Sequence, residues 1–101
     1  MSFRIVYDSE ATAEFREAVT WYEGQAEGLG TRFTHDVDKV MAAIISQPLR
    51  FSRIGKFGRK ARTLGWPYTI FFTVNESRSE IKVVAVWHGA RNPVDLQGRL
   101  K

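Results

Sequence analysis

One short segment of the sequence combines two residue types that could do chemistry. His88 and Arg91 lie three positions apart, just after a strand-like run. A histidine can transfer a proton near neutral pH, and an arginine can hold an anion through two parallel hydrogen bonds. Functional side chains are often displayed where a rigid strand opens into a loop. We therefore treat both residues as candidates. The sequence leaves open the alternative that His88 makes a local hydrogen bond in an ordinary turn.

A second candidate region is a long basic stretch in the middle of the chain. Residues 39–75 contain seven lysines and arginines and no acid, whereas residues 1–38 contain eight acids and three bases. Cations beside aromatic rings commonly hold phosphates and stack on bases. Aromatic residues are interleaved here, although each could simply anchor a loop to the core. The stretch predicts an anionic partner. The candidate binding residues are Arg59, Lys60, Arg62 and Tyr68, together with His88 and Arg91.

Several other chemistries find no support in the sequence. The absence of cysteine excludes disulfides, thiolate catalysis and cysteine-ligated zinc. His35 and His88 are far apart, and we expect His35 on a helix surface, so we predict no metal and no cofactor. No glycine-rich phosphate loop is present. No apolar run approaches the roughly 18 residues of a membrane helix, so we expect a cytoplasmic protein without membrane partners.

The hydrophobic pattern predicts the elements that must position these residues. A short strand at residues 3–7 precedes two amphipathic helices, at residues 9–24 and at Leu29–Ser46, joined at Gly28 and Gly30. Pro48 ends the second helix. We expect the first helix to expose its polar face, including Glu14, Glu17 and Glu23.

Three strands are expected in the second half, at residues 60–64, 68–74 and 80–87, followed by a tail or short helix at residues 94–100. In the last strand we expect Ile81, Val83, Ala85 and Trp87 on one face. The resulting order, β-α-α-β-β-β, predicts a single α+β domain over residues 1–101. Its helix hairpin would pack on a small antiparallel sheet that the first strand also joins.

An ordered set of short motifs spans nearly the whole chain. The motifs are Trp21-Tyr22-Glu23, Gly28-Leu-Gly30 with Phe33, Pro48 and Phe51, Arg62-x-Leu64, Pro67-Tyr68-x-Ile70-x-Phe72-x-Val74 and Val86-Trp-His88-Gly-Ala-Arg91-Asn-Pro93. This set resembles the RelE/ParE superfamily of toxins from bacterial type II toxin–antitoxin systems, and most closely its ParE-like, plasmid-stabilisation branch. The resemblance implies a growth-inhibiting toxin that is neutralised by a cognate antitoxin, which often binds through an acidic segment.

The resemblance also implies two alternative targets. RelE-like members cut mRNA on the ribosome without a metal, and Lys60 and Arg62 resemble their basic strand residues. In that case His88, Arg62 and Arg91 would be the catalytic candidates. Two departures weaken this alternative: Tyr68 stands where those nucleases tend to carry arginine, and the tail lacks their tyrosine or histidine. ParE-like members are associated with DNA gyrase inhibition, so we favour a non-catalytic inhibitor. We expect Lys60 and Arg62 to lie near His88 and Arg91.

Overall fold

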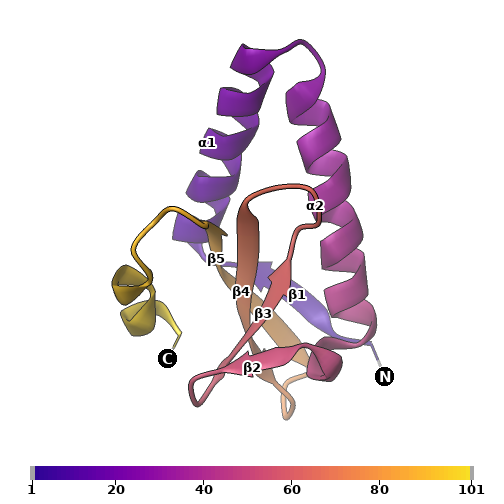
Figure 1. Ribbon diagram of the computed structural model, residues 1–101. Helices are drawn as coiled ribbons and strands as arrows, with labels where there is room; N and C mark the ends of the chain where they lie inside the picture. The colour runs from indigo at the N-terminus through magenta and orange to yellow at the C-terminus, as the bar shows by residue number, and fades with distance from the viewer. Residues whose placement is uncertain (1, 101) are drawn as a thin grey trace.

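The computed structural model describes residues 2–100, in which a helix hairpin stands on a five-stranded sheet (Figure 1). The elements in order are β1 (Arg4–Tyr7), α1 (Ser9–Gln25), α2 (Leu29–Ser46), the 3-10 helix η1 (Pro48–Arg50), β2 (Ser52–Ile54), β3 (Gly58–Arg62), β4 (Tyr68–Asn75), β5 (Glu80–His88) and the 3-10 helix η2 (Pro93–Arg99). The α+β class is confirmed. The predicted helices and last two strands agree with α1, α2, β4 and β5 to within one residue at each end.

The joint between the helices depends on two glycines and one glutamate. Gly28 adopts a left-handed conformation with a φ of 85°, which glycine allows without steric cost. A Cβ on Gly30 would lie 2.8 Å from the carbonyl oxygen of Val19, so only glycine lets the two helices approach this closely. The carboxylate of Glu23 accepts hydrogen bonds from the amides of Gly28 and Gly30, at 2.8 and 2.9 Å. Glu23 thus caps the start of α2 rather than being an uncommitted surface charge.

The strands lie in the order β1-β5-β4-β3-β2. The pairs β2–β3, β3–β4 and β4–β5 are antiparallel, as expected, whereas β1 pairs with β5 in parallel. The sheet is therefore mixed. Hydrophobic periodicity shows which face of a strand is buried but carries no information on strand direction.

The segment before the third predicted strand differs from expectation. β2 was not predicted, and β3 covers Gly58–Arg62 in place of residues 60–64. β2 and β3 form a hairpin in which Arg53 is opposite Arg59. Both strands are rich in arginine, lysine, serine and glycine, which have little strand propensity. Pairing with β4 places β3 in the sheet, and pairing with β3 adds β2 at its edge. Leu64 follows the end of β3 and is 84% exposed.

An irregularity in β5 changes which side chains face the helices. Phe71 is opposite Ala85, but Phe72 is opposite Val83, so Val84 is an extra residue in β5. Such a β-bulge reverses the side-chain alternation on either side of it. Val83 accordingly packs in the core beneath the helices, whereas Ala85 belongs to a core on the other face. The expectation that residues 81, 83, 85 and 87 share one face is wrong for this reason.

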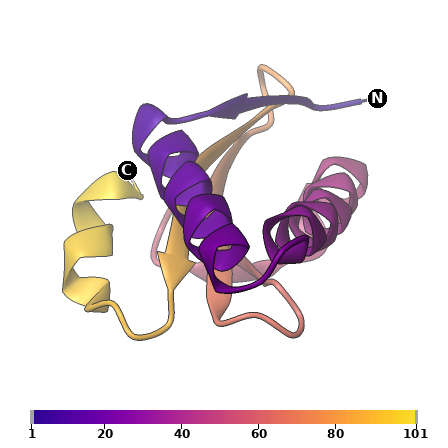
Figure 2. The ribbon, with the colours of Figure 1, turned by 90° about the horizontal axis from the view of Figure 1, so that it is seen from above.

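Two hydrophobic cores result, one on each face of the sheet. The larger core lies between the helices and the sheet and includes Phe33, Ile44, Ile70 and Phe72. The smaller core joins Phe71, Val84, Ala85 and Trp87 to Leu96 of η2. In the view from above, β5 and α1 lie between η2 and α2 (Figure 2). The C-terminal segment, expected as a tail or short helix, is thus part of the packed structure.

Candidate functional site

A groove of about 730 Å³ lies between α1 and the adjacent ends of β4 and β5. The helix contributes Glu14, Glu17 and Trp21 to its wall, and the strands contribute Tyr68 and His88. The loop after β5 adds Arg91 at the rim. The groove therefore contains three of the six residues expected to bind a target: Tyr68, His88 and Arg91.

Strand register brings Tyr68 and His88 together. The two residues are directly opposite each other on β4 and β5, and their ring centroids are 5.1 Å apart in an edge-to-face arrangement. Tyr22 of α1 adds a third ring, 6.3 Å from that of Tyr68. Burial raises the pKa of the Tyr68 hydroxyl, and nearby Tyr22 and Glu17 raise it further. Tyr68 is therefore a neutral hydrogen-bonding group at physiological pH.

His88 also has the local role that the sequence left open. Its Nδ1 accepts a hydrogen bond from the amide of Ala90 at 2.9 Å, which fixes the turn after β5 and leaves the other ring nitrogen for a partner. His35 is on the surface as expected, with its side chain 70% exposed. Residues 2–100 contain no cluster of three or more histidine or acidic side chains able to hold a metal ion.

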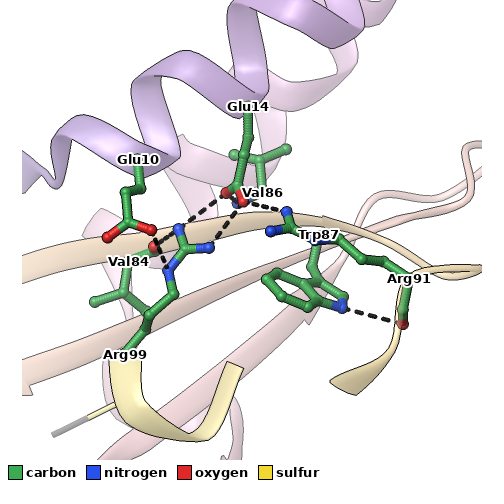
Figure 3. A network of polar contacts seen from close by, with 7 residues as sticks. All are labelled: Glu10, Glu14, Val84, Val86, Trp87, Arg91 and Arg99. Atoms are coloured by element: carbon green, nitrogen blue, oxygen red, sulfur yellow. Dashed lines mark hydrogen bonds and ion pairs between the residues drawn. The ribbon is translucent and has the colours of Figure 1, made fainter. Parts of the chain in front are cut away.

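Glu14 is the centre of the polar network beside the groove (Figure 3). Its carboxylate accepts two hydrogen bonds from Arg99, at 2.8 and 3.1 Å, and one each from Arg91 and the amide of Val86. Only 13% of its side chain is exposed, so the expectation of a solvated Glu14 is wrong. Burial alone would raise the pKa of Glu14, but the hydrogen bonds and the charge of Arg99 outweigh burial and lower it.

The network lies beside the second half of β5, along the edge of that strand where β1 pairs with its first half. β1 ends at Tyr7, opposite Val83, and leaves the following backbone groups of β5 without a strand partner. Glu14 accepts from the amide of Val86, and Arg99 donates to the carbonyl of Val84. Two side chains thus satisfy backbone groups that would otherwise be costly to bury.

Arg91 is held in place by two contacts rather than being free to bind an anion. Its guanidinium pairs with Glu14 and lies 3.8 Å from the ring centroid of Trp87. The indole of Trp87 in turn donates to the backbone carbonyl of Arg91 at 3.4 Å. An ion pair combined with a cation–π contact gives this side chain one preferred position.

Lys60 and Arg62 do not join this site. Arg62 is opposite Thr69, and Lys60 is opposite Phe71, whose ring packs in the core away from the helices. Along β4, Tyr68 and Ile70 alternate with Thr69 and Phe71, and they face the helices. The side chains of the two cations therefore project from one face of the sheet, and that of His88 projects from the other face. The expected proximity to His88 is wrong, because a shift of one residue along a strand changes the face on which a side chain lies.

Arg59 has a structural role in the same hairpin. Its guanidinium donates to the carbonyl oxygens of Leu49 and Phe51, at 3.0 and 2.8 Å. These bonds tie the η1 segment to β3. Of the basic stretch, Lys60 and Arg62 are exposed and remain candidates for anion binding, whereas Arg59 is committed to the fold.

Four residues of the site were not expected from the sequence to act there: Glu14, Trp21, Trp87 and Arg99. Glu14 and Arg99 are 85 positions apart, so no local pattern connects them. A local signal existed only for Glu14 and Trp21. Together with Glu17 they recur at intervals of three and four residues, which places all three on one side of a helix.

Comparison with known proteins identifies the family. The model of the ParE toxin of type II toxin–antitoxin systems, parDE, matches residues 5–93. The chain belongs to the ParE toxin family. It is therefore a member of the RelE/ParE superfamily, as the motifs suggested, and a toxin-type component of a type II system. No curated protein matches the sequence.

Solved structures of RelE/ParE proteins share the fold of this ParE-family chain. The chromosomal ParDE toxin–antitoxin system from P. aeruginosa aligns with a TM-score of 0.70 at 14% identity, covering 85% of this chain and 95% of that one. A mutant of the E. coli toxin RelE in the free state gives 0.71 at 14% identity, with 99% and 95% coverage. The isolated E. coli RelE toxin gives 0.67 at 17%, with 97% and 95% coverage. Within the described residues, no helix is long and apolar enough to cross a membrane.

Proposed function

We propose that this protein arrests growth by binding a cellular target, DNA gyrase, without catalysing a reaction. The observation that carries this proposal is the separation of the candidate catalytic groups. Lys60 and Arg62 are on one face of the sheet and His88 is on the other, while Arg91 is paired with Glu14. The match to the ParE branch of the superfamily supports the same conclusion.

Metal-free RNA cleavage sets a strict geometric requirement. Cations must contact the scissile phosphate while proton-transfer groups reach the attacking and leaving oxygens within hydrogen-bond distance. Lys60 and Arg62 point from the face of the sheet opposite to that of His88, which argues against these groups meeting at one phosphodiester. A binding function needs only a complementary surface, and the exposed Lys60 and Arg62 supply a cationic one.

We further propose that a cognate antitoxin neutralises the protein in the cytoplasm. The ParDE system from P. aeruginosa, whose fold this chain shares, is a toxin–antitoxin system. The acid-free stretch at residues 39–75 favours an acidic antitoxin segment on the cationic side. Binding of that segment should weaken as salt concentration rises, because exposed charges are screened.

The test is a supercoiling assay with purified gyrase. We expect the wild-type protein to inhibit supercoiling at micromolar concentration and Lys60→Ala/Arg62→Ala to inhibit it more weakly. Arg78→Ala, which removes an exposed cation from the β4–β5 turn, is the matched control and should behave as the wild type. Unimpaired supercoiling with the wild-type protein would refute gyrase as the target.

A parallel measurement distinguishes the ribosome-dependent endonuclease. Primer extension on translated mRNA should show no new cleavage when the protein is added. Cuts that disappear in His88→Ala and Arg62→Ala would overturn the non-catalytic proposal and establish mRNA cleavage.

A further inference from the structure

One face of α1 is acidic and aromatic, and it forms a wall of the groove. Glu10, Glu14, Glu17 and Trp21 recur at intervals of three and four residues, so their side chains lie on the same side of the helix. The face is only partly used by the fold. Glu14 is ion-paired with Arg99, and the carboxylate of Glu10 lies 3.6 Å from the Nε of Arg99. In the part of the chain that the structure describes, Glu17 has no ion-pair partner and is exposed.

Trp21 is exposed to an unusual degree for a tryptophan in a small protein. The residue is 60% exposed, although its ring touches Tyr22 edge-to-face at 5.1 Å between centroids. The ring of Tyr22 is paired with that of Tyr68, and the ring of Tyr68 is paired with that of His88. A row of aromatic rings therefore crosses the groove from the helix to the strand ends, and only its outermost ring lacks cover. Large exposed aromatic side chains of this kind are typical anchors of binding interfaces.

The charges of the groove restrict what can occupy it. The unpaired carboxylate of Glu17 repels phosphates and acidic peptides but attracts ammonium and guanidinium groups. Arg91 also lines the groove, and Glu10 and Glu14 together balance the charges of Arg91 and Arg99, which leaves the charge of Glu17 in excess. The exposed cations Lys60 and Arg62 do not line the groove. Tryptophan is the best aromatic partner for a cation, and an adjacent carboxylate strengthens the site.

We propose that this groove is a docking site for a partner-protein segment that places an arginine or lysine between Trp21, Tyr68 and Glu17. Aliphatic residues next to that cation would pack on the aromatic row. The occupant is thus basic and apolar, opposite in charge to the acidic segment expected at residues 39–75. The protein then has two separate docking surfaces of opposite charge. This inference goes beyond inhibition of gyrase and does not depend on it.

Peptide binding tests the site directly. The probe is a short acetylated and amidated peptide of leucine, alanine and arginine, and its matched counterpart has glutamate in place of each arginine. We expect the arginine peptide to bind, measured by calorimetry, and to shift the indole N–H resonance of Trp21 in NMR spectra. The glutamate peptide should bind far more weakly. Loss of one cation–π contact should weaken binding by about threefold to thirtyfold in Trp21→Ala, and Glu17→Gln should weaken it in the same direction.

The controls come from the opposite end of the molecule. Phe57 is 57% exposed on the β2–β3 side, and Glu76 is an exposed acid in the β4–β5 turn. Phe57→Ala and Glu76→Gln should bind the arginine peptide like the wild type. Glu17→Arg should reverse the preference toward the glutamate peptide. Any of three results would overturn the proposal. The first is tighter binding of the glutamate peptide than of the arginine peptide to the wild type. The others are unchanged binding in both Trp21→Ala and Glu17→Gln, and no binding of the arginine peptide at about millimolar concentration. If the protein does not inhibit gyrase, the peptide-binding results can still be interpreted, because the binding assay contains no gyrase.

Discussion

Replacement of Glu14 by glutamine is expected to destabilise the protein strongly. The substitution keeps the size of the side chain but removes the charge that Arg91 and Arg99 share. Arg99 has only 12% of its side chain exposed, so its nearly buried charge would keep only the more exposed Glu10, 3.6 Å from its Nε, as an ionic partner. Breaking a buried pair in this way costs about 3–5 kcal/mol. The glutamine carbonyl oxygen can still accept hydrogen bonds, and Glu10 stays near Arg99. We therefore expect a loss at the lower end of this range, about 3 kcal/mol in the free energy of unfolding.

That loss is a large part of the whole stability of a small domain, which is typically about 5–15 kcal/mol. Urea unfolding, followed by far-UV circular dichroism, measures it directly. With an m-value of about 1.5 kcal/mol per M, the midpoint should fall by about 2 M urea. Glu17→Gln is the matched control, because Glu17 lies one turn further along α1 and is exposed. Its midpoint should be within a few tenths of 1 M of the wild-type value.

The dependence on pH provides a second and independent test. The pKa of Glu14 is lower in the folded protein than its ordinary value of 4.5. The stabilisation by Glu14 is therefore fully present above pH 4.5 and is lost as pH falls through the folded-state pKa. The difference between wild type and Glu14→Gln should shrink as pH falls below 4.5. Equal midpoints for Glu14→Gln and Glu17→Gln at neutral pH, or a difference that grows on acidification, would refute this account of the network.

Three further substitutions test the fold. Gly30→Ala should lower the free energy of unfolding by about 1–3 kcal/mol, because its Cβ would lie 2.8 Å from the Val19 carbonyl oxygen; an unchanged thermal midpoint would contradict this. Gly24→Ala meets nothing within 4 Å and should raise stability by about 0.5–1 kcal/mol, so it serves as the control. Arg59→Met removes both hydrogen bonds to residues 49–51, and amide hydrogen exchange there should accelerate while exchange in α1 stays constant.

The candidate site was predictable only in part. The position of His88 and Arg91 after a strand made them candidates, and both lie at one groove with Tyr68. Lys60 and Arg62 were expected beside them but point from the face of the sheet opposite to that of His88. A basic stretch in a sequence shows how much charge is present locally, but strand register decides which face of the sheet each charge occupies.

The sequence by itself determined the α+β class, both helices and the long strands β4 and β5. Their apolar residues recur with the period of a helix or a strand, and such local patterns survive in almost any packing arrangement. It also determined the ParE-like motifs, because they are short and ordered along the chain. The weakly strand-forming residues of β2 and β3 gave no comparable pattern.

Only the tertiary structure decided the parallel pairing of β1, the bulge at Val84 and the role of Glu14. Each depends on groups far apart in the chain: β1 leaves part of the β5 edge open, and Glu14 and Arg99 complete it. Backbone groups without a strand partner must find hydrogen bonds, and the side chains that provide them are selected by proximity in space. For the same reason His88 and Arg91 share a groove with α1, whereas Lys60 and Arg62, which are closer to Tyr68 in sequence, do not.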